Sequence, residues 1–530
     1  MLRRGLAGDG ERRVAEWESE VEVGSDGWIA ESSWPVIERW ARAGEPEAMV
    51  LYGARLVHLG VAGQALPWLR RAVEAGVPGA AYNLGVCYEV TGDGVAARDV
   101  WRGAADTGDA DAMLGLVRLC LAEGDVAGAL VWYEPIIAAD DLEMLLRLAV
   151  ALRDAGEDEA AIRPLRVAIE HGDAWGMTYY ASILQTRGQL DEALSWHRRA
   201  ADLGNGRAAF EAGALLLERG DRAGAEVLLE QGARAGEVRA IANLGAMRYE
   251  AGDLAAAEEL FRAAAARGNP VAIHNLGTLL RDRGEVSAAA ELLIPLAQSN
   301  DPVAASLLAA VCRDRGDDEA AIEWYRVAAA AGDQDASVWL GNVLRERGDL
   351  AGARAAYLTA AEAGHPGAMV NLGTLLQGTE DQNEALRWLH DAAARGEPLA
   401  MYNLGYLYQE QGRYSEAKTW YRRAATLGDS SAAPNLGILY DTTDEPDQAI
   451  DWYRRAAADG EPKAMYNLGM LHARRAQARQ HQPDLEEAER WLAAAAELAD
   501  TDAAQRLIEL YTHQGNTTKA DYWRRHMPRP

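Results

Sequence analysis

Apolar residues along this chain form two helical stripes in every stretch of about 32 residues. In residues 397–428 the first stripe includes Leu404 and Tyr408, and the second includes Ala417 and Tyr421. Neighbours within each stripe lie three or four residues apart, which is the spacing of one face of an α-helix. A glycine-containing turn signal separates the stripes, and another ends the stretch. The pattern therefore predicts two antiparallel helices of about a dozen residues each, joined by a short turn.

The helix pair recurs with a fixed period of 32 residues over most of the chain. One alanine marks each repeat: Ala65, Ala97, Ala129, Ala161, Ala193, Ala225, Ala257, Ala289, Ala321, Ala353, Ala385, Ala417, Ala449 and, after a seven-residue insertion, Ala488 and Ala520. A fixed period of this size is typical of a solenoid, in which neighbouring repeats share one long core. The sequence therefore predicts an all-α solenoid of about fifteen helix pairs.

Glycines mark the ends of the predicted helices. Each regular repeat ends on a glycine such as Gly428, where a C-cap needs a left-handed backbone, and the two exceptions are Asp140 and Asn300. Asn and Asp tolerate that backbone best among the other residues, so the exceptions support the assignment. The glycine of the turn between the two helices is replaced at Glu380, Asp444 and Ala476, where we expect the turn to be rebuilt.

Small residues in the middle of the first helix predict close helix packing. Glycine at the position of Gly405 costs up to about 1 kcal/mol of helix stability relative to alanine, so we expect it to let the first helix approach Ala417 of the second. Tryptophan follows the repeat alanine by three residues at Trp68, Trp132, Trp196, Trp324, Trp388, Trp420, Trp452, Trp491 and Trp523. A tryptophan stripe at helical spacing is typical of core and inter-repeat packing rather than of ligand cages.

The repeat resembles two known families. The pattern Leu404-Gly405, Tyr408, Ala417 and Tyr421 resembles the tetratricopeptide repeat, and the phrases AMYNLG and WYRRAAxxG look still more like the related Sel-one-like repeat. The resemblance covers roughly residues 34–526, although the period of 32 is shorter than either family usually shows. It implies a right-handed α-solenoid superhelix that serves as a protein-interaction scaffold. It also implies that the first helix of each repeat lines a concave groove.

The chain is expected to have four parts. Residues 1–43 form an N-terminal cap and half-repeat, with a helical segment around Arg12–Val21, and residues 44–473 form the regular repeats. Residues 474–482 are a locally basic insertion that is either a partner contact or a helix extension. Residues 483–530 form the last repeat and the C-terminal cap.

Charge, cysteine content and missing motifs restrict the partners, the compartment and the kind of activity expected for this chain. The chain has 53 Lys and Arg against 81 Asp and Glu, and its net charge of −28 disfavours nucleic acid and anionic membranes as partners. Three cysteines without a CxxC predict buried thiols in a reducing compartment. We find neither a secretory signal nor an apolar run long enough to span a membrane, so a cytoplasmic protein is expected. Catalytic motifs such as HExxH and GxSxG are missing, so we expect no enzyme, cofactor or metal.

The sharpest candidate for binding is an asparagine ladder, formed by Asn371, Asn403, Asn435 and Asn467 in four consecutive repeats and by Asn83, Asn243 and Asn275 in others. This position points away from the core stripe, so it should flank the inner surface. An asparagine amide pairs with both the C=O and the N–H of an extended peptide, so a row of them can grip a partner's backbone. The alternative is that each asparagine bonds a neighbouring helix or loop of its own repeat.

Apolar side chains accompany the ladder and predict a partly aromatic groove floor. They lie one residue before each asparagine at Val370, Tyr402, Pro434 and Tyr466, and three residues after it at Thr374, Tyr406, Ile438 and Met470. Exposed aromatic and methionine surface commonly marks a partner site. Packing between adjacent first helices is the alternative explanation.

A second candidate is an arginine stripe at one helical position of three repeats, formed by Arg281, Arg313 and Arg345. These side chains could receive carboxylates of a partner. The alternative is a solvated network with Asp282, Asp314 and Glu346 of adjacent repeats.

Together these features predict an adaptor that binds an extended partner segment in a concave groove, mainly in the C-terminal third. The alternative is a structural or regulatory subunit that binds a folded partner, or a second copy of itself, through its ends or convex face.

Overall fold

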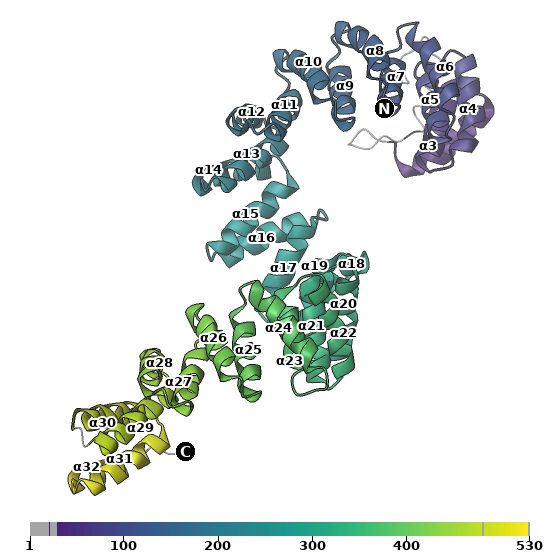
Figure 1. The fold of residues 1–530 in the computed structure, drawn as a ribbon. Coiled ribbons are helices and arrows are strands. Elements are labelled where there is room, and N and C mark those ends of the chain that lie inside the picture. The colour runs from purple at the N-terminus through teal and green to yellow at the C-terminus, as the bar shows by residue number, and fades with distance from the viewer. Residues whose placement is uncertain (1–20, 22–28, 480–481, 528–530) are drawn as a thin grey trace. The chain divides into compact units, whose positions relative to one another are not determined.

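The computed structural model describes residues 21, 29–479 and 482–527. Every helix or strand element over these residues is a helix (Figure 1). A short 3-10 helix, η1 (Glu31–Ser33), and α2 (Trp34–Ala43) precede fifteen consecutive helix pairs. The all-α repeat solenoid expected from the sequence is confirmed. The helical segment expected around Arg12–Val21 falls almost wholly outside the described residues.

Each pair consists of a first and a second helix. The first helices are α3 (Pro46–His58), α5 (Ala80–Val90), α7 (Ala110–Ala122), α9 (Leu142–Asp154), α11 (Ala174–Thr186), α13 (Gly206–Glu218), α15 (Val238–Glu250), α17 (Pro270–Asp282), α19 (Pro302–Asp314), α21 (Gln334–Glu346), α23 (Pro366–Leu375), α25 (Pro398–Glu410), α27 (Ala432–Thr442), α29 (Pro462–Arg479) and α31 (Thr501–His513). The second helices are α4 (Ala62–Glu74), α6 (Gly94–Ala105), α8 (Val126–Ala138), α10 (Asp158–Glu170), α12 (Leu190–Asp202), α14 (Arg222–Arg234), α16 (Leu254–Ala265), α18 (Val286–Gln298), α20 (Asp318–Ala330), α22 (Leu350–Glu362), α24 (Gln382–Ala394), α26 (Tyr414–Thr426), α28 (Pro446–Ala458), α30 (Gln482–Glu497) and α32 (Thr517–Arg525).

The array divides into an N-terminal unit, Met1–Ala272, and a C-terminal unit, Ile273–Pro530. Within each unit, a helix packs mainly against its neighbours in the chain. First helices of successive repeats also contact each other, as α5 and α7 do in the N-terminal unit and α27 and α29 do in the C-terminal unit. Several successive first helices therefore lie side by side within each unit.

The helix ends follow the expected cap chemistry. The aspartate that precedes many helices accepts a hydrogen bond from the third helical residue, as Asp125 does from the Gly128 N–H at 2.8 Å. At the C-caps, Asp140 and Asn300 adopt positive φ angles of 53° and 64°, as expected for residues that replace the cap glycine. In the rebuilt turns Asp444 itself adopts a φ of 60°. No turn forms at Ala476, because residues 474–479 extend helix α29.

The core is built around a large side chain that follows the repeat alanine by four residues. None of these side chains is more than 5% exposed: Leu69, Trp101, Tyr133, Leu165, His197, Leu229, Phe261, Leu293, Tyr325, Tyr357, Leu389, Tyr421, Tyr453 and Leu492. The mid-helix glycines face this side chain, since a Cβ added at Gly405 would lie 2.7 Å from Tyr421 Cδ1. At the equivalent position of another repeat, a Cβ added at Gly373 would also lie 3.3 Å from the carbonyl oxygen of the repeat alanine, Ala385, so the close approach of the two helices expected from the sequence is present. The glycine leaves room for the core side chain.

The tryptophan stripe lies one residue before this core position and is half-buried in most repeats. Arginines cover several of the indole rings, and the Arg199 guanidinium lies 4.2 Å from the ring centroid of Trp196. Trp68, Trp132 and Trp196 also pack against the buried clusters of their repeats. These contacts agree with packing and not with ligand cages. The three cysteines are free and buried, and burial raises the pKa of the Cys87 thiol.

Candidate partner-binding surface

Three residues of the asparagine ladder connect their repeat to the one before it. Asn371 Nδ2 donates to Asn342 Oδ1 at 3.4 Å, and Asn403 Nδ2 donates to Thr374 Oγ1 at 3.0 Å. Asn435 Nδ2 donates to Tyr402 Oη at 2.9 Å. Each acceptor lies on the first helix of the preceding repeat. These bonds join neighbouring repeats, whereas the alternative to peptide binding expected bonds within one repeat. In the N-terminal unit, Asn83 instead donates to the Gly79 carbonyl of its own helix.

Asn467 breaks the pattern, because the preceding repeat offers no acceptor. The positions that accept from Asn403 and Asn435 in earlier repeats are occupied by Ile438 and Pro434. Asn467 is half-buried, and its amide forms no hydrogen bond with any described residue. Asn243 and Asn275 are also half-buried and without such a bond. Of the four consecutive ladder residues, Asn467 alone has a whole amide free for a ligand among the described residues.

The apolar row beside the ladder is exposed in its middle and covered at its ends. Tyr406 is 43% and Ile438 40% exposed on adjacent first helices, α25 and α27. Tyr402 is half-buried, and its ring centroid lies 5.5 Å from that of Tyr421. Val370 is buried, so the expectation that it contributes to a groove floor was wrong.

At the end of the row, Tyr466 and Met470 pack against the C-terminal core cluster. Arg506 replaces the ladder asparagine in the last repeat, and its hydrogen bond with Tyr466 raises the pKa of the guanidinium. The two outward-facing side chains, Tyr406 and Ile438, together with Asn467 define what we call the ladder face.

The arginine stripe is mostly an internal charge network. Arg281 Nε lies 2.5 Å from Asp314 Oδ2, and this hydrogen bond raises the pKa of Arg281. Arg313 Nη2 lies 3.1 Å from Glu346 Oε2 of the next repeat. Asp314 and Glu346 each lie 33 residues after the arginine that they pair with, and the residue 33 positions after Arg345 is Gly378. Arg345 is therefore left exposed, without an ion pair over the described part of the chain. Only Arg345 remains available to a partner's carboxylate.

Two cavities lie in the N-terminal unit, where the sequence pattern gave one candidate, Asn83, which lines the larger cavity. Their volumes are about 880 and 510 Å³, and both are lined by Tyr82, Arg118, Glu143 and Arg147. Tyr82 and Tyr179 occupy the same repeat positions as Tyr402 and Asn403. An aromatic residue at these positions is the signal that could have indicated the cavities.

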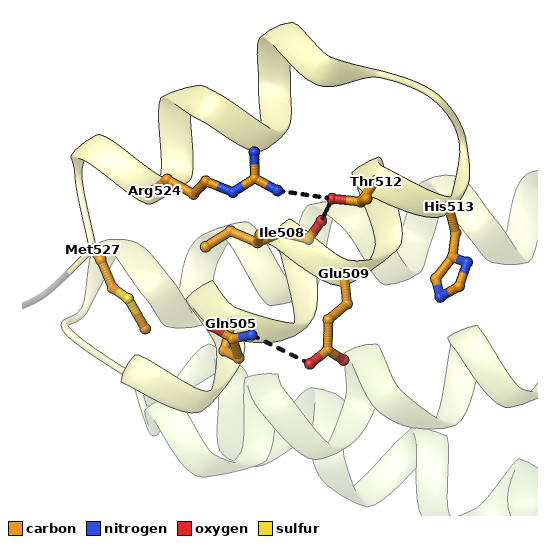
Figure 2. A pocket seen from close by; sticks show the side chains of 7 residues that line it. All are labelled: Gln505, Ile508, Glu509, Thr512, His513, Arg524 and Met527. Carbon is orange, nitrogen blue, oxygen red and sulfur yellow. Dashed lines mark hydrogen bonds between the residues drawn. The ribbon is translucent and has the colours of Figure 1, made fainter.

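A further pocket of about 430 Å³ lies between the last two helices, α31 and α32 (Figure 2). Five of its seven lining side chains are polar. Three hydrogen bonds join lining residues: Arg524 Nη2 to Thr512 Oγ1 and Gln505 Nε2 to Glu509 Oε1, both at 3.3 Å, and Thr512 Oγ1 to the Ile508 carbonyl at 2.6 Å. This end of the array has the polar character expected of a C-terminal cap.

Metal and membrane features were sought over the described residues only. No group of three or more His, Cys, Asp or Glu side chains is placed to hold a metal ion there. None of the described helices combines the length and apolar character needed to cross a membrane.

We expect Asn403→Ala and Asn467→Ala to differ in stability although they remove the same side chain from the same repeat position. Asn403→Ala deletes an inter-repeat hydrogen bond and should lower the free energy of unfolding by about 1 kcal/mol. Asn467→Ala deletes no bond and should change it by less than about 0.5 kcal/mol. Urea unfolding of both variants measures the difference. Equal losses would show that Asn467 also bonds a neighbouring repeat.

Comparison with protein-family models identifies tetratricopeptide repeats and Sel1 repeats along the chain. Tetratricopeptide models match residues 110–135, 274–336, 334–358, 367–397 and 398–429. The Sel1 model matches residues 78–97, 175–205, 238–269, 435–461 and 462–500. No curated protein matches the chain in sequence.

Solved structures with the same kind of fold include c5321, described as a protective antigen present in uropathogenic Escherichia coli strains and displaying an SLR fold. It is 23% identical, covers 90% of this chain and 97% of its own, and superposes with a TM-score of 0.51. A Sel1 repeat protein from Oxalobacter formigenes is 27% identical over 52% of this chain and 89% of its own, with a TM-score of 0.41.

Proposed function

Because the chain belongs to the tetratricopeptide and Sel1 repeat proteins, we propose that it is a scaffold whose C-terminal unit holds an extended segment of a partner protein. Repeats of this family generally mediate protein–protein interactions. The observation that carries the proposal is the ladder face, where Tyr406 and Ile438 are exposed beside the unpaired amide of Asn467. Exposed apolar side chains beside unused hydrogen-bonding groups are what a peptide-binding surface requires.

In this proposal, different residues at and around the ladder face make different contacts with the partner. The amide of Asn467 can donate to a backbone carbonyl and accept from a backbone N–H. Asn403 and Asn435 use an Nδ2 proton within the protein, so their Oδ1 atoms serve as acceptors for partner N–H groups. Tyr406 and Ile438 supply apolar contact area, and the exposed Arg345 lies on α21, two repeats before Tyr406. Tyr402, Tyr466, Arg281 and Arg313 then act by holding the neighbouring helices in place.

The role proposed is binding, with no catalytic step and no cofactor. The net charge of −28 argues against nucleic acid and anionic membrane surfaces as partners. The three free thiols are what a reducing compartment preserves, and we place the protein in the cytoplasm on that ground.

The test is quantitative affinity capture from the native extract with three forms of the full chain. These are the wild type, the triple variant Tyr406→Ala/Ile438→Ala/Asn467→Ala, and a control, Leu350→Ala/Leu427→Ala. The control removes apolar side chains that are at least as exposed, but from the start of a second helix, α22, and from the C-cap of another, α26. Losing the exposed contacts should weaken the binding of a partner at least about tenfold. Partners lost only from the triple variant support the ladder face.

Partners retained equally by all three forms would move the site to the ends or the second-helix face. Light scattering during size exclusion would then show whether the partner is a second copy of the chain.

A further inference from the structure

The two cavities of the N-terminal unit adjoin each other along the first helices. The larger is lined by residues of α3, α5, α7 and α9 as well as by Trp34 and Ile29, and the smaller by residues of α5, α7, α9 and α11. They share Tyr82, Arg118, Glu143 and Arg147. We call this surface the N-terminal groove. It lies on the first helices, as the ladder face does, but in the other unit of the array.

The dimensions of the N-terminal groove suit an extended polymer. Packed helices lie 8–10 Å apart, so five first helices in a row span about 40 Å. An extended chain covers about 3.3 Å per residue, so about twelve residues would follow the groove from end to end. A compact small molecule would fill only one of the two cavities.

The walls of the N-terminal groove are apolar and aromatic. Trp34 and Tyr82 line the larger cavity, and Tyr179 and Trp175 line the smaller one. Trp175 is 46% exposed, and its ring centroid lies 6.3 Å from that of Tyr179. Aromatic rings in this setting bind apolar side chains and also attract cations to their faces.

The lining side chains that carry a charge without an ion-pair partner among the described residues are carboxylates. The three arginines are held by carboxylates of the chain itself: Arg147 pairs with Asp111 at 2.5 Å, Arg118 with Glu89 at 3.8 Å, and Arg55 with Glu31. The other acidic side chains of the lining are Asp109, which caps α7, and Glu143 and Asp154, which form no ion pair over the described part of the chain. Glu143 and Asp154 are exposed at opposite ends of α9.

We infer that the N-terminal groove binds an extended segment of a partner protein in which arginine or lysine alternates with apolar residues. The cationic side chains of the segment would pair with Glu143 and Asp154, and its apolar side chains would contact Tyr82, Trp175 and Tyr179. The net charge of −28 steers such a segment toward the protein. This second site is independent of the ladder face, and loss of one leaves the other intact.

The experiment uses fluorescence anisotropy with the full chain and two labelled dodecapeptides at 150 mM salt. One alternates arginine with leucine, and the other carries glutamate in place of arginine. The arginine peptide is expected to bind at least tenfold more tightly than the glutamate peptide. Glu143→Gln/Asp154→Asn should weaken it about tenfold, and Val150→Arg, which adds a long cationic side chain to the half-buried lining, should weaken it further.

A matched variant separates the groove from general attraction to an acidic protein. Glu192→Gln/Asp202→Asn removes the same two charges from exposed positions of α12, a second helix, and should leave the affinity within twofold of the wild type. Equal weakening by both double variants would overturn the inference, as would tighter binding of the glutamate peptide. Circular dichroism melting of each variant verifies that it is folded before its affinity is compared.

Discussion

Replacing Gly85 with alanine is expected to destabilise the N-terminal unit by about 3 kcal/mol, although alanine is the better helix former. A Cβ at this position would lie 2.1 Å from Trp101 Nε1, which is far inside contact distance. The indole cannot retreat, because Gly115 of the next first helix faces its other side and a Cβ there would lie 2.7 Å from Trp101 Cε2. Trp101 is fully buried, and its Nε1–H donates to the Tyr82 carbonyl at 3.1 Å. Displacing the ring therefore costs both packing and a buried hydrogen bond.

The matched control for Gly85→Ala is Gly103→Ala. Gly103 is a helical glycine of α6, the helix that carries Trp101, and a Cβ there would meet nothing within 4 Å. Alanine at this position should stabilise the protein by up to about 1 kcal/mol. Hydrogen exchange over α5, α6 and α7 in the full chain measures both effects locally, which is appropriate because solenoids unfold in segments.

Gly85→Ala in a Trp101→Leu protein tests whether the clash with Trp101 causes the loss of stability. In the repeat that contains Leu165, alanine already occupies the small position at Ala149. Gly85→Ala should therefore be nearly neutral in a Trp101→Leu protein, and the double-mutant cycle should show a coupling of about 2 kcal/mol or more. A Gly85→Ala protein with wild-type protection factors would show that the indole has room to move, and the packing explanation of the mid-helix glycines would fail.

The repeat architecture was accessible from the sequence because each feature is set by local chemistry. The left-handed caps at Asp140 and Asn300 follow from backbone preferences of single residues. The contact of Gly405 with Tyr421 was not predicted, because two helical positions four residues apart lie on the same face, and spacing alone does not show which side chain comes nearest to the glycine. Tyr421 is larger than Ala417, and glycine at position 405 leaves room for it.

The candidate site was harder to predict from the sequence because its hydrogen bonds join different repeats. The position of Asn467 in its own helix is the same as that of Asn403, yet only Asn403 has an acceptor, Thr374, on the preceding first helix. The N-terminal groove was not predicted for a related reason. Its depth depends on how five helices pack, which the spacing of the aromatic residues Tyr82, Trp175 and Tyr179 along the chain does not show.

Acid is expected to weaken the N-terminal unit through one buried histidine. His197 is fully buried at the core position that holds leucine in the adjacent repeats, at Leu165 and Leu229. Its Nε2 lies 2.9 Å from Gln185 Oε1, and its Nδ1 is buried without a hydrogen-bond partner. Burial, and secondarily the charge of Arg207, lowers the pKa of His197 to about 4. Protonation would place a cation and an unmatched N–H in the core, so the folded protein keeps this imidazole neutral.

The sign of the pH effect follows from proton linkage. Below its ordinary pKa of about 6.5 the histidine is protonated in the unfolded chain, whereas in the folded protein it stays neutral until about pH 4. Between these values the unfolded state binds more protons, so stability falls as the pH falls. The loss attributable to His197 should reach about 2 kcal/mol from pH 7 to pH 5.

His197→Leu isolates this contribution, because leucine fills the equivalent position of both neighbouring repeats. Hydrogen exchange over α11, α12 and α13, corrected for the intrinsic pH dependence, should show protection that declines from pH 7 to pH 5 in the wild type and much less in the variant. The matched control is His171→Leu, since His171 is exposed at the end of α10 and contacts Asp140 on the surface. Because His171 lies on the surface and outside this core, His171→Leu should retain the wild-type decline. An equal decline in the His197→Leu protein would mean that carboxylates, and not this imidazole, set the acid sensitivity of the unit.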